Sequence, residues 1–318
     1  MRSSFGVCAL LTSAVLSATA HAELAYGGEA AMLGSFTAEQ MQAIRGGASV
    51  KSSALFSTNW VGDSRGSTYA LGGIGGAIDG VTPGQAGWKT YGGSVNSYNI
   101  ATTTDLGRAG RALTVSGSKK ANTYRYAFQD LSSQWNARRA TDNVLWAEYE
   151  QYTPGTNAGS ANIAGLTMFD SGNRALAGMG VGYGSGIGSS YPHRSVYGIA
   201  YNFGSSGFDN YYYTLSGGGA PLANGGWTNF ATSFNKSTGV VQWFYSVDGG
   251  NSYTGYYING WAAGASLSTA DFRMNNFGLF DNAGATAVFG NLNVYALPSP
   301  GAAALALVGM LFRRARRN

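Results

Sequence analysis

The chain has 318 residues, with 20 Lys+Arg against 15 Asp+Glu and a formal net charge of +5. Five of the basic residues are Arg2, Arg313, Arg314, Arg316 and Arg317, so the body between the two ends holds 15 basic and 15 acidic residues. A body without net charge argues against a nucleic-acid-binding face. Glycine is abundant at 49 residues, but only 6 prolines accompany it and 44% of the chain is apolar. That composition excludes a low-complexity disordered chain and can build a core.

Residues 1–22 have the layout of a secretory signal peptide. Arg2 is followed by an apolar stretch from about Val7 to Ala18 and by the small-x-small sequence Ala20-His21-Ala22. This order predicts cleavage before Glu23 and an exported protein, and a buried N-terminal helix is the alternative.

Export with cleavage at this point would leave a mature chain with little reactive chemistry. The single cysteine, Cys8, and one of the two histidines, His21, would be removed. The remaining His193 lies in a loop-like segment and is better explained as a solvated turn residue than as a catalytic base. Disulfides, cysteine nucleophiles and sites made of several Cys or His ligands are therefore excluded within one mature chain.

The C-terminal segment, residues 297–318, begins with Leu297-Pro298-Ser299-Pro300-Gly301. An apolar run, Ala302 to Phe312, and the Arg313-Arg314-Ala315-Arg316-Arg317 cluster follow. As an α-helix the run spans roughly 18 Å, short of the roughly 30 Å of a bilayer core. Arginines that follow an apolar helix are expected on the cytoplasmic side of the membrane, so this order places the N-terminal body outside the cytoplasm.

This tail resembles that of PEP-CTERM proteins, with Ser299 where the class usually carries Glu. The resemblance implies an exosortase-type sorting enzyme as a partner and contact with the membrane through the C-terminal helix before processing. It also implies a final location in the cell envelope or extracellular matrix. A plain C-terminal membrane anchor is the alternative.

Within residues 23–50, the stretch Phe36 to Arg45 predicts a short helix. Thr37 and Gln40 have the spacing of a capping box, Leu33 and Ile44 fall on one face, and Gly46-Gly47 ends the helix. The same residues resemble a double-glycine leader, but such leaders begin a chain, so we favour the helix.

From residue 51 to residue 296 the pattern changes to alternating aromatic and β-branched residues separated by Gly, Asn, Ser and Asp. Strands are predicted at 54–61, 88–91, 97–101, 112–116, 123–129, 144–152, 163–169, 195–203, 210–215, 228–234, 240–247, 272–280 and 287–296. So many short strands without intervening helices predict one all-β, antiparallel sandwich or barrel.

Four parts of this region resemble the concanavalin A-like, laminin-G-like jelly rolls. They are Leu145 to Glu150, Ala164 to Asp170, Gly239 to Gly250, and the closing Phe277 to Asn282 with Gly290 to Val294. The resemblance implies an antiparallel jelly-roll β-sandwich, flanked here by the short N-terminal helix and the C-terminal apolar helix.

Glu148 and Glu150 form the closest pair of carboxylates. On a strand they point to one face about 7 Å apart, a separation that suits a glycosidase acid and nucleophile. The jelly-roll glucanases carry a further acid on this strand, which is absent here. The structural alternative, which we favour, places both on a solvent face with Tyr149 inward.

Glycan binding has two other sources in the sequence. Glycine alternates from Gly178 to Gly188, so a strand here would carry a flat trough through Gly180, Gly182 and Gly184, and a flexible loop is the alternative. Tyr191 and Trp261 lie in loop-like contexts, where their rings could stack on sugars.

Two further features give no specific functional site. Ser246 to Tyr253 resembles an Asp-box, and we interpret it as a folding hairpin. Asp209-Asn210 and Asp281-Asn282 could supply oxygen atoms to calcium, although no motif specifies a site, and no cofactor is predicted.

These features together predict an exported, non-catalytic surface or matrix protein, with exopolysaccharide or matrix proteins as partners. A glycoside hydrolase or polysaccharide lyase on the same fold is the alternative.

Overall fold

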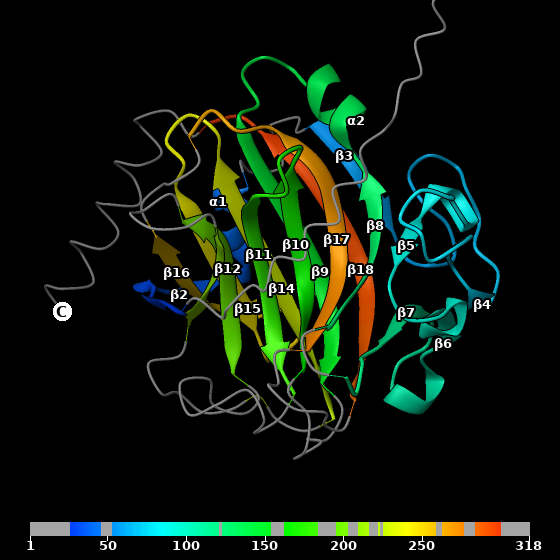
Figure 1. Cartoon of the computed structure of the whole chain (residues 1–318). Coiled ribbons are helices and arrows are strands. Elements are labelled where there is room, and N and C mark those ends of the chain that lie inside the picture. Colours follow the sequence, from blue (N-terminus) through cyan, green and yellow to red (C-terminus); the bar gives the residue numbers. More distant parts are fainter. Residues whose placement is uncertain are drawn as a thin grey trace, which may run out of the picture.

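A computed structural model describes residues 26–45, 53–120, 123–153, 162–183, 195–202, 209–215, 222, 225–258, 263–276 and 284–299. Its strands form two sheets, which we call sheet A and sheet B (Figure 1). Sheet A has eight strands, in the spatial order β1 (Tyr26–Glu29), β13 (Asp209–Thr214), β12 (Val196–Asn202), β11 (Ala175–Gly182), β10 (Asn162–Asp170), β17 (Leu267–Asn276), β8 (Thr123–Asp130) and β5 (Lys89–Tyr91).

Sheet B has ten strands. Their spatial order is β2 (Ala31–Thr37), β16 (Ser252–Ile258), β15 (Val241–Ser246), β14 (Gly226–Asn235), β9 (Val144–Thr153), β18 (Thr286–Leu297), β7 (Arg111–Ser116), β6 (Tyr98–Thr102) and β4 (Gly72–Gly73), with β3 (Ser53–Thr58) paired to β18. The helices are α1 (Ala38–Ile44), α2 (Ser132–Ala137) and the 3-10 turns η1 (Gln85–Gly87), η2 (Val95–Ser97) and η3 (Thr104–Leu106).

The prediction of an antiparallel, all-β protein is confirmed. Every described strand pair is antiparallel except that of β1 with β13. The predicted strand ranges overlap observed strands, with ends that differ by a few residues. The predicted C-terminal helix lies outside the described residues. Within those residues, no helix combines the length and apolar content that crossing a membrane requires.

Large aromatic side chains from both sheets fill the space between them. Phe272 on β17 is fully buried, and its ring centroid lies 4.4 Å from that of Phe289 on β18 and 5.8 Å from that of Tyr149 on β9. The Tyr149 hydroxyl donates a hydrogen bond of 2.8 Å to the carbonyl oxygen of Met179 on β11. Tyr149 therefore points inward, as predicted, and joins the two sheets.

The N-terminal segment is part of the sandwich, contrary to the predicted boundary at residue 51. β1 pairs with β13 at one edge of sheet A, and β2 pairs with β16 at one edge of sheet B. The Thr37 and Gln40 capping box is confirmed, but Leu33 belongs to β2 and not to the helix. Met41 of α1 packs on the outer face of sheet B with Trp146 and Phe244.

Candidate functional site

The outer face of sheet A at its β5 edge carries a group of partly exposed aromatic rings. On β8, Ala127 points into the core, so Tyr126 and Phe128 point outward. Tyr91 on β5 lies opposite Tyr126 in register. The Tyr91 and Tyr126 rings are stacked, with centroids 5.0 Å apart and planes at 21°, and the Phe128 ring lies 5.7 Å from Tyr126. We call these three residues the tyrosine platform.

Tyr91 is the exposed end of the platform, because 47% of its surface is accessible. Tyr126 is partly covered, and the Arg273 guanidinium lies 4.6 Å from its ring centroid. Burial raises the pKa of the Tyr126 hydroxyl, against the opposing effect of Arg273. The hydroxyl therefore stays protonated at neutral pH and can donate a hydrogen bond.

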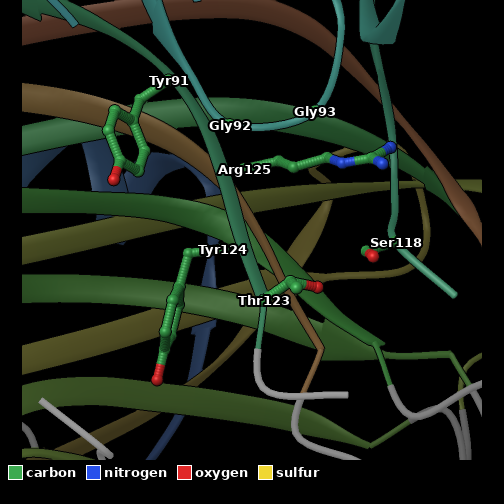
Figure 2. A pocket seen from close by; sticks show the side chains of 7 residues that line it. All are labelled: Tyr91, Gly92, Gly93, Ser118, Thr123, Tyr124 and Arg125. Carbon is green, nitrogen blue, oxygen red and sulfur yellow. The ribbon is translucent and has the colours of Figure 1, made fainter. Parts of the chain in front are cut away.

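A surface pocket of about 350 Å³ adjoins the platform at the start of β8. We call it the edge pocket, and its lining residues are Tyr91, Gly92, Gly93, Ser118, Thr123, Tyr124 and Arg125. Figure 2 shows Tyr91 and Tyr124 on one side of the strand and Arg125 extending to the other, past Gly93. Because Tyr91 belongs to both, the platform and the pocket form one continuous surface.

The turn after β5 determines the shape of this pocket. Gly92 and Gly93 both have φ of +77°, a conformation that side chains rarely adopt. A Cβ on Gly92 would overlap the backbone carbonyl oxygen of Tyr124, so glycine is required for this close approach. The Tyr98 hydroxyl shares its one proton between the carbonyl oxygens of Tyr91 and Gly92 and holds the turn in place.

Glu148 and Glu150 lie on the outer face of sheet B, each in an ion pair. Oε2 of Glu148 lies 2.9 Å from Nη1 of Arg45, and Oε1 accepts a hydrogen bond from the Trp146 indole. Oε2 of Glu150 lies 2.6 Å from Nη2 of Arg108. Each of the two carboxylates therefore has its own arginine partner on the outer face of sheet B.

The alternating glycines form the strand β11 as far as Gly182, but they do not form an open trough. Gly180 and Gly182 are buried, as is every other residue of β10 and β11. A Cβ on Gly180 would lie 2.7 Å from the carbonyl oxygen of Ala164 on β10. The glycines therefore permit close packing of neighbouring backbones, which corrects the expectation of an accessible glycan surface at Gly180 and Gly182.

The Asp-box forms the hairpin between β15 and β16, as predicted. Oδ1 of Asp248 accepts hydrogen bonds from the Ser246 hydroxyl at 2.7 Å and from the backbone nitrogens of Asn251 and Ser252 at 3.0 Å. These bonds hold the pKa of Asp248 well below its usual range. Its oxygen atoms are thus occupied by the turn itself.

Several predicted positions fall outside the described residues. They are the cleavage site at Ala20, Ala22 and Glu23, the glycan candidates Gly184, Tyr191 and Trp261, the calcium candidate Asp281, and the tail residues Pro300, Gly301, Arg313, Arg314, Arg316 and Arg317. Pro298 is described and follows β18 directly, and the next residue, Ser299, donates a backbone hydrogen bond to Thr141. Among the described residues, no group of three or more His, Cys, Asp or Glu side chains could hold a metal ion.

The tyrosine platform and Arg125 were not identified as a site from the sequence. Their signal is the run Tyr124-Arg125-Tyr126-Ala127-Phe128, in which one parity of a predicted strand is entirely aromatic. A strand whose aromatic residues face the core has the same alternation, so the pattern alone does not tell whether the rings lie in the core or on the surface.

No protein-family profile and no curated protein matches the chain. Among solved structures, an alginate lyase from Klebsiella pneumoniae aligns with a TM-score of 0.43 and 10% identity, over 62% of this chain and 83% of that one. The CBM2 module of the evolved Dit of Lactobacillus casei BL23 phage J-1 aligns with a TM-score of 0.40 and 10% identity, over 79% and 98%. A botulinum neurotoxin type C structure, from work on cell entry through two ganglioside molecules, aligns with a TM-score of 0.43 and 11% identity, over 85% of this chain and 53% of the toxin chain.

Proposed function

We propose that this protein is an exported, non-catalytic component of the cell surface or extracellular matrix that binds exopolysaccharide through the tyrosine platform. The body would be a jelly roll of the concanavalin A-like type, delivered by the signal peptide and sorted through the PEP-CTERM-like tail. The observation that carries the binding function is the stacked pair of Tyr91 and Tyr126 beside a pocket at an accessible sheet edge.

The chemistry of the platform suits a sugar. Tyrosine rings offer rigid apolar planes that stack on the C–H faces of sugar rings, and their hydroxyl groups form hydrogen bonds at the edge. The platform is preorganised, because Tyr98 holds the backbone of Tyr91 and the Tyr126 ring is fixed by stacking and by Arg273. Little conformational entropy would be lost when a ligand binds.

A Tyr91→Ala variant tests the proposal. Loss of one stacking ring reduces the free energy of glycan binding by about 0.5–1.5 kcal/mol, which weakens binding about two- to tenfold. Affinity electrophoresis through gels containing polysaccharides, after a glycan-array screen, measures the loss. The control is Tyr257→Ala, which removes a partly exposed ring from β16 of sheet B and should leave mobility unchanged. An array without hits for the unaltered protein, or equal effects of the two variants, would exclude the platform as a glycan site.

A further inference from the structure

The edge pocket is positively charged within a body that has no net charge. Its lining contains one cation, Arg125, and no acidic residue. Lys119 and Lys120 follow Ser118 directly and are both exposed. A volume of about 350 Å³ lies within the range of small-ligand sites, about 300–1,000 Å³.

Arg125 has no carboxylate partner in the described part of the chain, unlike three other arginines of the sandwich. Arg45, Arg108 and Arg273 are paired with Glu148, Glu150 and Asp271 respectively. Nη1 of Arg125 instead donates to the carbonyl oxygens of Ser116 at 2.7 Å and Gly117 at 3.0 Å. These neutral acceptors orient the guanidinium without cancelling its charge.

The acidic residues near the platform already have partners. Oδ2 of Asp271 lies 2.8 Å from Nη2 of Arg273. Asp79, whose backbone pairs with that of Tyr91, accepts hydrogen bonds from the backbone nitrogens of Val81 and Thr82 and from the Thr82 hydroxyl. Asp130 lies within the electrostatic influence of Lys89 and accepts a hydrogen bond from the Ser132 hydroxyl. Among the described residues, none of these carboxylates pairs with Arg125.

We infer, on the basis of the proposed glycan-binding function, that the ligand is an acidic polysaccharide. Its carboxylate or sulfate group binds Arg125 in the edge pocket, while another sugar ring of the same polymer stacks on Tyr91, which lies on the other side of β8. Guanidinium groups recognise both anions through paired N–H donors, and such charge-assisted hydrogen bonds are the strong ones in proteins. Lys119 and Lys120 add attraction that salt screens.

The test uses polymers that differ only in charge. Polygalacturonate is compared with its methyl ester, and dextran sulfate with dextran, on the full chain by calorimetry at low and high salt. We expect the acidic member of at least one pair to bind at least about tenfold more tightly than its neutral partner. The pair that shows this difference tells whether the anion is a carboxylate or a sulfate.

Arg125→Gln should remove most of the preference for the acidic polymer and leave the affinity for the neutral polymer unchanged. The matched control is Arg111→Gln. Arg111 lies on β7 of sheet B, and its Nη1 also donates to a backbone carbonyl, that of Tyr69. Because Arg125 supports the turn at Ser116, two further variants guard against misfolding. Arg125→Lys retains the charge and should retain most of the preference, and Lys119→Gln removes an exposed charge and should weaken only the acidic polymer, about two- to threefold.

The outcomes separate this inference from the function on which it rests. Equal binding of acidic and neutral polymers, sensitive to Tyr91→Ala but not to Arg125→Gln, would overturn the inference and leave glycan binding intact. Binding of neither polymer pair, together with an array without hits, would overturn both. A preference for acidic polymers that Arg125→Gln and Arg111→Gln reduce equally would place the anion elsewhere and refute the role of Arg125.

Discussion

Replacing Glu150 by Gln distinguishes a structural carboxylate from a catalytic one. Oε2 of Glu150 is 2.6 Å from Nη2 of Arg108 and accepts a hydrogen bond of 3.2 Å from the backbone nitrogen of Asn291. Glutamine keeps the shape of the side chain and can still accept the bond from Asn291. The variant therefore removes the charge of the ion pair and little else.

The expected loss of stability is small. The Arg108 and Glu150 side chains are 30% and 23% exposed, so solvent screens the pair and it contributes about 0.5–1 kcal/mol. Arg108 also lies 4.7 Å from the centroid of the Trp227 ring, a contact that survives the substitution. We expect Glu150→Gln to lower the free energy of unfolding by about 1 kcal/mol and the melting temperature by about 2–4 °C for a domain of this size.

Urea unfolding of Glu150→Gln, Arg108→Gln and the double variant measures the coupling in a double-mutant cycle. Glu39→Gln, which removes an exposed acid from the first turn of α1, is the control and should show no coupling to Arg108→Gln. Each protein is also incubated with acidic and neutral polysaccharides, and chain length is followed by gel filtration. Shortening of a polymer by the unaltered protein, lost in Glu150→Gln without a change in stability, would refute the structural role.

Three further results are expected. Phe272→Ala removes a fully buried ring between the two sheets and should cost about 3–5 kcal/mol by urea unfolding, and a loss under about 1 kcal/mol would mean that the core packs differently. Hydrogen bonds from the Thr82 hydroxyl and from nearby backbone nitrogens lower the pKa of Asp79 to about 2, so its stabilisation is present above about pH 4 and disappears as pH falls towards 2. Asp79→Asn should therefore flatten the acid limb of stability against pH, and parallel curves would contradict this. Mass spectrometry of exported protein should find a start at Glu23 and no residues 313–318, and an intact arginine cluster would contradict processing.

Alternation of apolar residues predicted most of the strands because each exposes one face to the core. β11 was left open between a strand and a flexible loop because Ala175 to Gly182 is rich in glycine and poor in β-branched residues, and its strand identity comes from pairing with β10. β2 was missed because Leu33 fits the periodicity of the following helix, whereas pairing with β16 extends this segment. Both cases depend on distant partners, which local propensity cannot include.

The side of β8 that faces the core could not be predicted from hydrophobicity. Tyr124, Tyr126 and Phe128 are more apolar as a set than Arg125 and Ala127, so the pattern favours placing them inside. In the structure Ala127 lies opposite Phe272 and faces inward, because Phe272 and its aromatic neighbours fill the space there. At Ala127 the inward face of β8 has room only for a small residue, and the aromatic rings of the other parity are left on the outer face.

The stacking of Tyr91 on Tyr126 has a similar origin. It depends on the register between β5 and β8, which are separated by more than thirty residues in the sequence, and on the turn at Gly92 and Gly93. Neither the register nor the turn leaves a local signal that identifies the pair.

The pairing of charges also depends on contacts between residues distant in the sequence, and this explains how the edge pocket can carry positive charge in a body without net charge. Counting residues treats every arginine alike, but Arg45, Arg108 and Arg273 are neutralised by carboxylates within 3 Å, whereas Arg125 faces only carbonyl oxygens. A chain with equal numbers of acids and bases can therefore present an unpaired cation wherever packing separates one from a partner. What a surface attracts depends on which charges remain unpaired. Here Arg125, which has no carboxylate partner among the described residues, lines the same pocket as Tyr91, the most exposed ring of the platform.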